Sequence, residues 1–334
     1  MTNSCEWKSK LISSSLPLEY ECAQILVSKG FSINADYKYA RIDSNDSNEK
    51  DFSVDLDAVL VYDLHKSDQG STHLELLVEC KQKKLDSKWL FLPDPNPMHM
   101  SEISTRGDII HSVDEFSRYF FSHSSKNKLS DFFEKRQICY KGTEINLTNG
   151  NVFDSEIKHG ISQLQYALPR LLIQNIVHCL KGFVINKSYS YLFMYCPILV
   201  TTADLYVAKD NLKTIDVENA DTLGQIADQV PCLIVSSDIG PDFETHCIRE
   251  SEKLAIQRFT PSLKELEKIR EENGGYEYRS PLLITRGLLN ADTFRLQEYF
   301  TQFIVCSKDY FPLLLDEMKE ISKNATVEIS NKMK

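Results

Sequence analysis

The chain has 334 residues, 42% of them hydrophobic, so it is long enough to enclose a full core without help from disulfides. Its formal net charge of −10 excludes the class of proteins that coat nucleic acid through an overall basic excess. The nine cysteines stand singly, without the paired spacing of a zinc site, and this pattern suits reduced thiols in a cytosol.

The N-terminal residues MTNSCEWKSKLISSS lack the apolar run of a secretory signal. No stretch approaches the roughly 18 to 20 apolar residues that cross a bilayer. We therefore expect a cytoplasmic protein with no membrane partner.

The first hundred residues predict a helix followed by three strands. Residues 16–30 have an apolar stripe at helical spacing, with Pro17 in the first turn and Gly30 as the stop. Residues 31–42, 52–64 and 73–82 are typical of strands separated by polar turns. In the second strand Asp55 and Asp57 share one face, and in the third Glu79 and Lys81 do.

The rest of the chain predicts a mixture of helices and strands. Residues 89–92 favour a short strand and 113–133 a partly exposed helix, both within an insertion at about 85–155. The pattern further predicts helices at 156–180, 262–273, 292–304 and 310–322, and strands at 191–201, 231–236 and 282–285.

Two acids and a lysine on neighbouring strands are suited to phosphodiester hydrolysis. Side chains alternate along a strand and neighbouring strands lie about 5 Å apart, so Asp57 and Glu79 can converge on one ion. Hard Mg²⁺ is held by carboxylates and carbonyls, and the backbone carbonyl of Cys80 could complete its shell. An ammonium such as that of Lys81 can position the attacking water or stabilise charge on the phosphate.

The triplet Glu-x-Lys carries little information alone, because it also occurs at 6–8, 156–158 and 317–319. The context of Glu79-Cys80-Lys81 distinguishes it, since it ends an apolar strand that directly follows a strand with an inward-facing acid. A structural ion pair of Lys81 with Asp57 is the alternative reading.

With VDLDAVLVY and LLVECKQ on successive strands, the segment resembles the PD-(D/E)XK, or restriction-endonuclease-like, nuclease superfamily. The resemblance implies an α/β fold whose core runs helix, three antiparallel strands, helix and strand: a mixed β-sheet core flanked by helices over 1–237, with the insertion helical. A C-terminal α/β extension over 238–334 would pack on the core or be continuous with it. The family proline is absent, because Leu56 precedes Asp57, and Asp55 is the alternative ligand.

The resemblance also implies the site and its partners. Asp57, Glu79, Lys81 and Glu19 would be catalytic, with Mg²⁺, or Mn²⁺ in its place, on Asp57, Glu79, Cys80 and Glu19. Nucleic acid would contact Lys83, Lys84, Lys88 and Gln163. The expected function is a DNA endonuclease of restriction or phage-defence type, acting as a homo-oligomer or with a companion defence protein. RNA as the substrate, and a catalytically silent binding module, are the alternatives.

Overall fold

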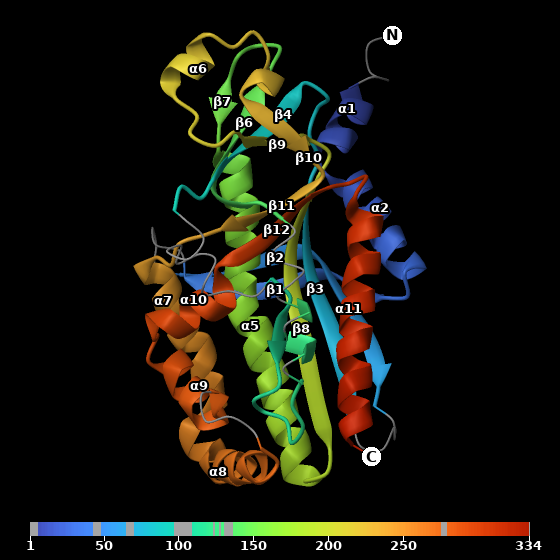
Figure 1. Cartoon of the computed structure of the whole chain (residues 1–334), viewed down its shortest axis with the longest axis vertical. Helices are drawn as coiled ribbons and strands as arrows, with labels where there is room; N and C mark the ends of the chain where they lie inside the picture. Colours follow the sequence, from blue (N-terminus) through green and yellow to red (C-terminus); the bar gives the residue numbers. More distant parts are fainter. Residues whose placement is uncertain are drawn as a thin grey trace.

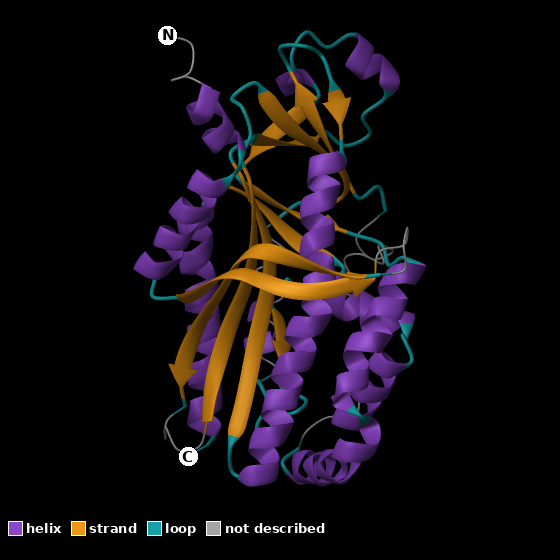
Figure 2. Ribbon diagram, turned by 180° about the vertical axis from the view of Figure 1, so that it is seen from behind, coloured by secondary structure: helices purple, strands orange, loops and turns teal. Residues whose placement is uncertain are grey.

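The computed structural model describes residues 6–42, 48–64, 70–96, 109–122, 124–126, 128–129, 136–274 and 279–333. Within them a mixed sheet of twelve strands has helices on both faces (Figures 1 and 2). The predicted mixed α/β class is confirmed. Its main strands follow the order β1-β2-β3-β8-β12-β11-β6-β4-β9-β10.

The first three strands form an antiparallel meander, as predicted. They are β1 (Ser32–Ile42), β2 (Glu49–Asp63) and β3 (Gly70–Lys81). Strand β8 (Ser190–Thr201) runs parallel to β3 and is buried at every position, as expected for a strand covered on both faces. Strand β12 (Gln302–Ser307) runs parallel to β8.

Two helical layers cover this part of the sheet. Helices α2 (Leu16–Ser28) and α11 (Phe311–Lys332) bury Leu18, Leu26 and Leu314 in one cluster with Leu76 and Val78 of β3. On the opposite face, α5 (Ser155–Ile185) packs against odd-numbered residues of β3 such as Leu77. The alternation of β3 therefore decides that Glu79 and Lys81 lie on the α5 side.

Helix α5 is the helix predicted at 156–180, extended at its C-terminal end. It is long and apolar enough to cross a bilayer by length and composition, contrary to the expectation that no stretch approaches this limit, and 56% of its most apolar window is buried inside the protein. The β1–β2 hairpin curves around this helix (Figure 2), and Arg41 at the end of β1 pairs with Asp242 of α7 (Pro241–Ser251) at 2.8 Å.

The expected helical insertion is mainly strand in its described residues. Strands β4 (Ser87–Pro93) and β6 (Ile138–Asn146) pair with each other, and β4 also pairs with β9 (Asp204–Ala208). The insertion also contains two short strands, β5 (His111–Val113) and β7 (Val152–Phe153). Outside it, the short strand β10 (Ala227–Val230) pairs with β9. The helix predicted at 113–133 is wrong for 113–122, where 113 ends β5 and the following residues form turns and loop. It is confirmed for 124–126 and 128–129, which are helical, while 123, 127 and 130–133 lie outside the described residues.

The C-terminal third is built into the same sheet, because β12 lies between β8 and β11 (Cys232–Ser236). A boundary at residue 237 therefore does not separate two sheets. The strand predicted at 282–285 is wrong: Ser280 caps a helix there, α9 (Pro281–Leu289), with a proline in its first turn. The helix predicted at 292–304 is wrong beyond α10 (Thr293–Phe300), since the apolar run after it is β12.

The other helices are short or lie at the periphery. They are α1 (Glu6–Ser13), α6 (Thr214–Glu218) and α8 (Ile256–Glu272), with single 3₁₀ turns at Leu223–Gln225 and Glu252–Leu254. Helix α8 confirms the prediction at 262–273, and α11 confirms and extends the one at 310–322.

Candidate active site

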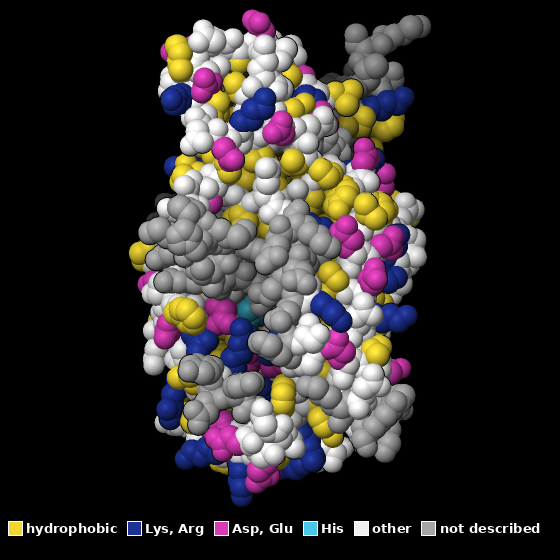
Figure 3. All heavy atoms as spheres, viewed as in Figure 1, with side chains coloured by type: hydrophobic (Ala, Val, Ile, Leu, Met, Phe, Trp, Pro, Cys, Tyr) yellow, Lys and Arg dark blue, Asp and Glu magenta, His cyan; other side chains and the backbone are white. Residues whose placement is uncertain are grey.

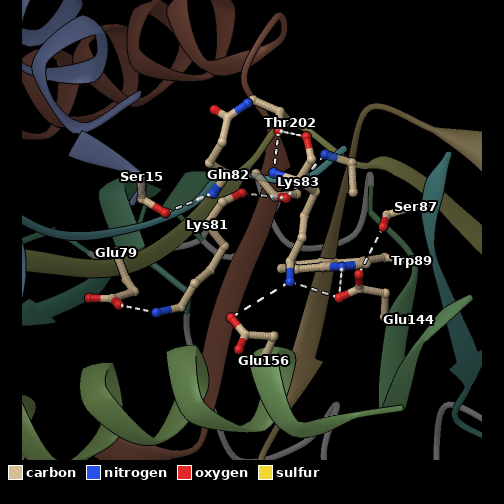
Figure 4. A network of polar contacts seen from close by, with 12 residues as sticks. Ser15, Glu79, Lys81, Gln82, Lys83, Ser87, Trp89, Glu144, Glu156 and Thr202 are labelled. Atoms are coloured by element: carbon tan, nitrogen blue, oxygen red, sulfur yellow. Dashed lines mark hydrogen bonds and ion pairs between the residues drawn. The ribbon is translucent and has the colours of Figure 1, made fainter. Parts of the chain in front are cut away.

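The carboxyl end of β3 meets the start of α2. Ser15 precedes α2 in a left-handed conformation, with φ of 61°. Its hydroxyl accepts a hydrogen bond of 3.0 Å from the backbone N–H of Gln82, directly after β3 (Figure 4). This contact brings the first turn of α2, with the half-buried Glu19, to the strand end that carries Glu79 and Lys81.

The register of β2 against β3 brings Asp55 close to Glu79. Leu56 lies opposite Val78 in the antiparallel β2–β3 pair. Continuing this register by one residue puts Asp55 opposite Glu79, and directly opposed side chains share one face. The Asp55 carboxylate also accepts a hydrogen bond of 2.7 Å from the backbone N–H of Cys80.

Lys81 is held by two partners on this face. Its Nζ donates to Glu79 Oε1 at 2.7 Å (Figure 4). It also donates to Gln163 Oε1 of α5 at 3.2 Å. Gln163 in turn donates to the backbone carbonyl of Ser53 at 2.9 Å. Gly160 makes room for this arrangement, since a Cβ at that position would lie 3.3 Å from Lys81 Cε and 2.8 Å from Leu199.

Glu79 keeps one carboxylate oxygen without a partner. The side chain is 1% exposed, and Oε2 has no hydrogen-bond donor. Burial, followed by the charge of Asp55, raises its pKa to about 7, although Lys81 and the backbone N–H of Asp55 oppose this shift. An unsatisfied buried carboxylate oxygen is costly, and a cation would compensate it.

Asp57 lies two residue pairs further along the strands. It faces Leu77, and its carboxylate accepts from Asn34 Nδ2 at 3.4 Å. Burial raises its pKa. The structure therefore places Asp55 opposite Glu79, where the sequence analysis preferred Asp57 and kept Asp55 as the alternative.

A further acid, Asp36, adds negative charge beside the site. Burial and then the charges of Asp55 and Asp36 raise the pKa of Glu19, while Lys81 lowers it. Asp36 has a left-handed φ of 59° inside β1, a conformation that Asp tolerates better than most residues. Sequence reasoning missed Asp36, because an acid on an exposed strand position carries no signal of its own.

Two of the lysines predicted to bind nucleic acid are engaged by nearby acids. Lys83 Nζ contacts Glu144 at 2.8 Å and Glu156 at 3.6 Å, and Lys88 contacts Asp204 at 2.5 Å. Lys84 is exposed. Lys83 thus joins the β3–β4 turn to β6 and α5, and Lys88 joins β4 to β9.

The candidate ligands fit a hard divalent cation only if water occupies several of its coordination positions. Among the described residues, no three carboxylate, imidazole or thiol groups form a closed metal-binding cluster. Mg²⁺ typically takes one or two carboxylates and keeps several waters. The carboxylates of Asp55 and Glu79, with the carbonyl of Cys80, satisfy that requirement, and the unpartnered Glu79 oxygen supports the fit.

No family model, curated protein or solved structure matches this chain. The argument for function therefore depends on the site itself.

Proposed function

We propose that this protein is a divalent-cation-dependent nuclease of the PD-(D/E)XK type, with Asp55, Glu79, Lys81 and Glu19 at its active site. One observation carries the proposal. Asp55 lies beside the motif on β3, since it accepts a bond from the backbone N–H of Cys80; Lys81 bonds to Glu79, and Glu79 Oε2 is buried without a hydrogen-bond partner. Groups of this kind are costly to bury unless they bind an ion.

The order of elements supports the same proposal. A helix, three antiparallel strands, a helix and a strand parallel to the third occur in the order α2, β1, β2, β3, α5 and β8, with β4 to β7 of the insertion between β3 and α5. This is the order of the superfamily core that the sequence resembles. The DNA substrate and a role in restriction or phage defence follow from that resemblance, and RNA is a second substrate to test.

Each residue has a distinct task in this proposal. Asp55, Glu79 and the Cys80 carbonyl would hold Mg²⁺ or Mn²⁺, which would neutralise phosphate charge and activate water. Lys81 donates to the attacking water or to a phosphate oxygen after exchanging its bond to Glu79. Gln163 fixes Lys81 from α5, and Glu19 adds a carboxylate from the first turn of α2, within reach of the charges of Asp55 and Lys81.

A binding module that retains a nuclease-like fold is the competing function. The observation in its favour is the 2.7 Å bond between Lys81 and Glu79, which is also what a structural ion pair would form. A silent module would bind nucleic acid or a companion protein without cutting, and its affinity would not depend on Mg²⁺.

Cleavage of defined substrates tests the proposal. The purified chain is incubated with linear DNA, circular DNA and RNA, with Mg²⁺, with Mn²⁺ or with a chelator. We expect metal-dependent cleavage that is lost in Asp55→Asn and Lys81→Met. Lys158→Met, in another Glu-x-Lys triplet and 73% exposed, is the matched control. Cleavage that survives both site substitutions rejects this active site, and metal-independent binding without cleavage favours the module.

A further inference from the structure

Two cysteines face each other on adjacent strands in the centre of the sheet. Strands β11 and β12 lie side by side (Figure 1), and their antiparallel register places Cys232 directly opposite Cys306. At the next pair along, the backbone N–H of Ser307 donates to the carbonyl of Pro231 at 2.9 Å. Hydrogen-bonded and non-hydrogen-bonded pairs alternate along antiparallel strands. Cys232 and Cys306 therefore form a non-hydrogen-bonded pair, the kind in which opposed side chains lie closest.

This pairing brings the two cysteines within the reach of a disulfide. The Cα atoms of a non-hydrogen-bonded pair lie about 4.5 Å apart, and disulfides join Cα atoms separated by roughly 4.4 to 6.8 Å. Both side chains belong to the buried cluster on the side of α2 and α11. The Cys306 thiol, which also donates to the carbonyl of Ser307 at 3.1 Å, lies within hydrogen-bonding distance of the Cys232 thiol. A bond between the two sulfurs thus requires little movement of the strands.

Arg136 favours the thiolate form of Cys232. Its guanidinium hydrogen-bonds to the Cys232 sulfur and is held in place by Glu317 of α11. The contact with Cys306, and then the charge of Arg136, lower the pKa of Cys232, although burial and Glu317 oppose this shift. Burial alone raises the pKa of the Cys139 thiol to about 12. Because the thiolate is the nucleophilic form of cysteine, Cys232 is the reactive member of the pair.

Cys232 also lies nearer to solvent than its partner. It is 8% exposed, whereas Cys306 is 0% exposed. The Glu317 side chain that pairs with Arg136 is 37% exposed. Figure 3 shows charged side chains on the surface where Figure 1 places α11. A small, water-soluble reagent can therefore approach Cys232 from this side, while Cys306 is reached only through Cys232.

We propose that Cys232 and Cys306 are a peroxide-reactive dithiol. The Cys232 thiolate attacks one oxygen of hydrogen peroxide, so that an S–O bond forms, the O–O bond breaks, and the departing hydroxide takes up a proton to become water. The Cys306 thiol then attacks the sulfenic sulfur: an S–S bond forms, the S–O bond breaks, and the hydroxyl leaves with the thiol proton as a second water. The two thiols lose two electrons, and one peroxide gains them.

The proposed dithiol is separate from the candidate active site. Val200 of β8 lies between Cys80 of β3 and Cys306 of β12 in the strand register. Cys80 is in contact with Cys22, and this contact, followed by burial, raises the pKa of the Cys80 thiol well above its usual value. A raised pKa disfavours the reactive thiolate, so Cys22 and Cys80 are expected to stay reduced. The inference does not depend on the nuclease function, and its test requires no cleavage.

Peptide mapping after oxidation tests the pair. The reduced full-length chain is exposed to hydrogen peroxide, its remaining thiols are alkylated in denaturant, and tryptic peptides are identified by mass spectrometry. We expect the loss of two thiols per chain and a cross-link from Cys306 to Cys232 that dithiothreitol reverses. Fragmentation must distinguish Cys232 from Cys247, because no Lys or Arg separates them. Cys306→Ala should stop at a sulfenic acid on Cys232, which dimedone traps.

Substitutions of Arg136 test its effect on the rate. Arg136→Met should slow the loss of thiols by about 10-fold or more, because the thiolate becomes rarer. Arg136→Lys keeps a positive charge and should retain most of the rate. A rate that is unchanged in a folded Arg136→Met, as judged by circular dichroism, overturns the role of Arg136.

Cys139→Ala is the matched control for the cysteines. Cys139 is buried on β6, the other neighbour of β11, where its partner is Val235. This variant should form the same cross-link at the same rate as the wild type. Thiols that all resist peroxide until urea unfolds the chain overturn the proposal, and so does a first disulfide between Cys22 and Cys80 or between two chains. Since mapping of the wild type needs no variant, a variant that fails to fold leaves this test intact.

Discussion

The carboxylate of Asp55 accepts a 2.7 Å hydrogen bond from the backbone N–H of Cys80, the residue between Glu79 and Lys81. This bond joins β2 to the Glu79-Cys80-Lys81 motif on β3 and holds the carboxylate of Asp55 close to that of Glu79. It also distinguishes Asp55 from Asp57, which bonds to Asn34 at 3.4 Å. The roles of two acids on the same strand face are therefore separable by experiment.

Asp55→Asn should abolish cleavage, whereas Asp57→Asn should not. Removing a cation ligand that faces Glu79 should lower kcat by about 100-fold or more, the usual size of a lost charge-stabilising group. Asp57→Asn should change kcat by less than about 10-fold, because Asp57 only neighbours the reacting groups. This limit corresponds to ~1.4 kcal/mol of activation free energy. Asp51→Asn, on an exposed position of the same strand, is the control. If Asp57→Asn lowers kcat more than Asp55→Asn does, Asp57 and not Asp55 is the cation ligand.

Cation binding and stability should change together with pH near the pKa of Glu79. That pKa is raised from an ordinary 4.5 to about 7. A raised carboxyl pKa stabilises the folded state below about 4.5, and this contribution is lost as the pH rises through about 7. In EDTA, the free energy of unfolding should therefore fall between these pH values, and Mg²⁺ should restore it above pH 7, where the carboxylate is ionised.

Urea denaturation from pH 5 to 8 measures this effect. Buried Glu75 also has a pKa raised to about 7, so the wild type should lose stability through both groups. The difference between the wild type and Glu79→Gln isolates Glu79. A pH dependence of unfolding that is unchanged in Glu79→Gln, and no stabilisation by Mg²⁺ in the wild type, would contradict the cation site.

Lys81→Met should separate catalysis from cation binding. Its ammonium donates to Glu79 but supplies no cation ligand, so we expect kcat to fall by about 100-fold or more. Mn²⁺ affinity, measured by calorimetry, should stay the same or rise, since a competing positive charge has gone. A loss of Mn²⁺ affinity together with activity would instead make Lys81 a structural partner of the acids.

Lys83→Met should destabilise the fold, whereas Lys84→Met should not. Lys83 pairs at 2.8 Å with Glu144, which is 3% exposed and also accepts from Ser87 at 2.9 Å. An unpaired buried carboxylate costs roughly 3 kcal/mol, so the urea midpoint should fall clearly. Lys84 is exposed, and its substitution should leave stability within about 0.5 kcal/mol. If Lys83→Met and Lys84→Met both leave stability nearly unchanged, the pair with Glu144 does not stabilise the fold, and Lys83 is available to bind nucleic acid.

Gly160→Val should reduce activity through the position of Lys81. Even a Cβ would meet Leu199 at 2.8 Å and Lys81 Cε at 3.3 Å, so a branched side chain must displace the lysine from Gln163. We expect kcat to fall by about 10-fold or more while Mn²⁺ affinity is retained. Gly182→Val, elsewhere on α5 against the ring of Tyr189, controls for crowding of the helix. An unaffected kcat would show that Lys81 needs no such space.

Local sequence patterns predicted the elements around the site, because each has a strong period of its own. Alternation in 52–64 and 73–82 predicted β2 and β3, and the apolar stripe of 156–180 predicted α5. The same reasoning gave wrong predictions in the C-terminal region, where the apolar segments are short. The run 282–285 is helical because Ser280 and Pro281 start a helix, and 302–307 is a strand because β8 and β11 offer it pairing partners.

By itself the sequence determined the meander, the long core helix and the presence of two acids and a lysine on one face. The strands depend on the alternation of side chains and the helix on its apolar stripe, and both patterns are local to one segment. Only the tertiary structure decided that Asp55 and not Asp57 lies opposite Glu79, that Lys83 pairs with Glu144, and that β12 lies in the centre of the sheet. Register between strands and pairing of distant charges depend on how separate segments fit together, and no single segment encodes that fit.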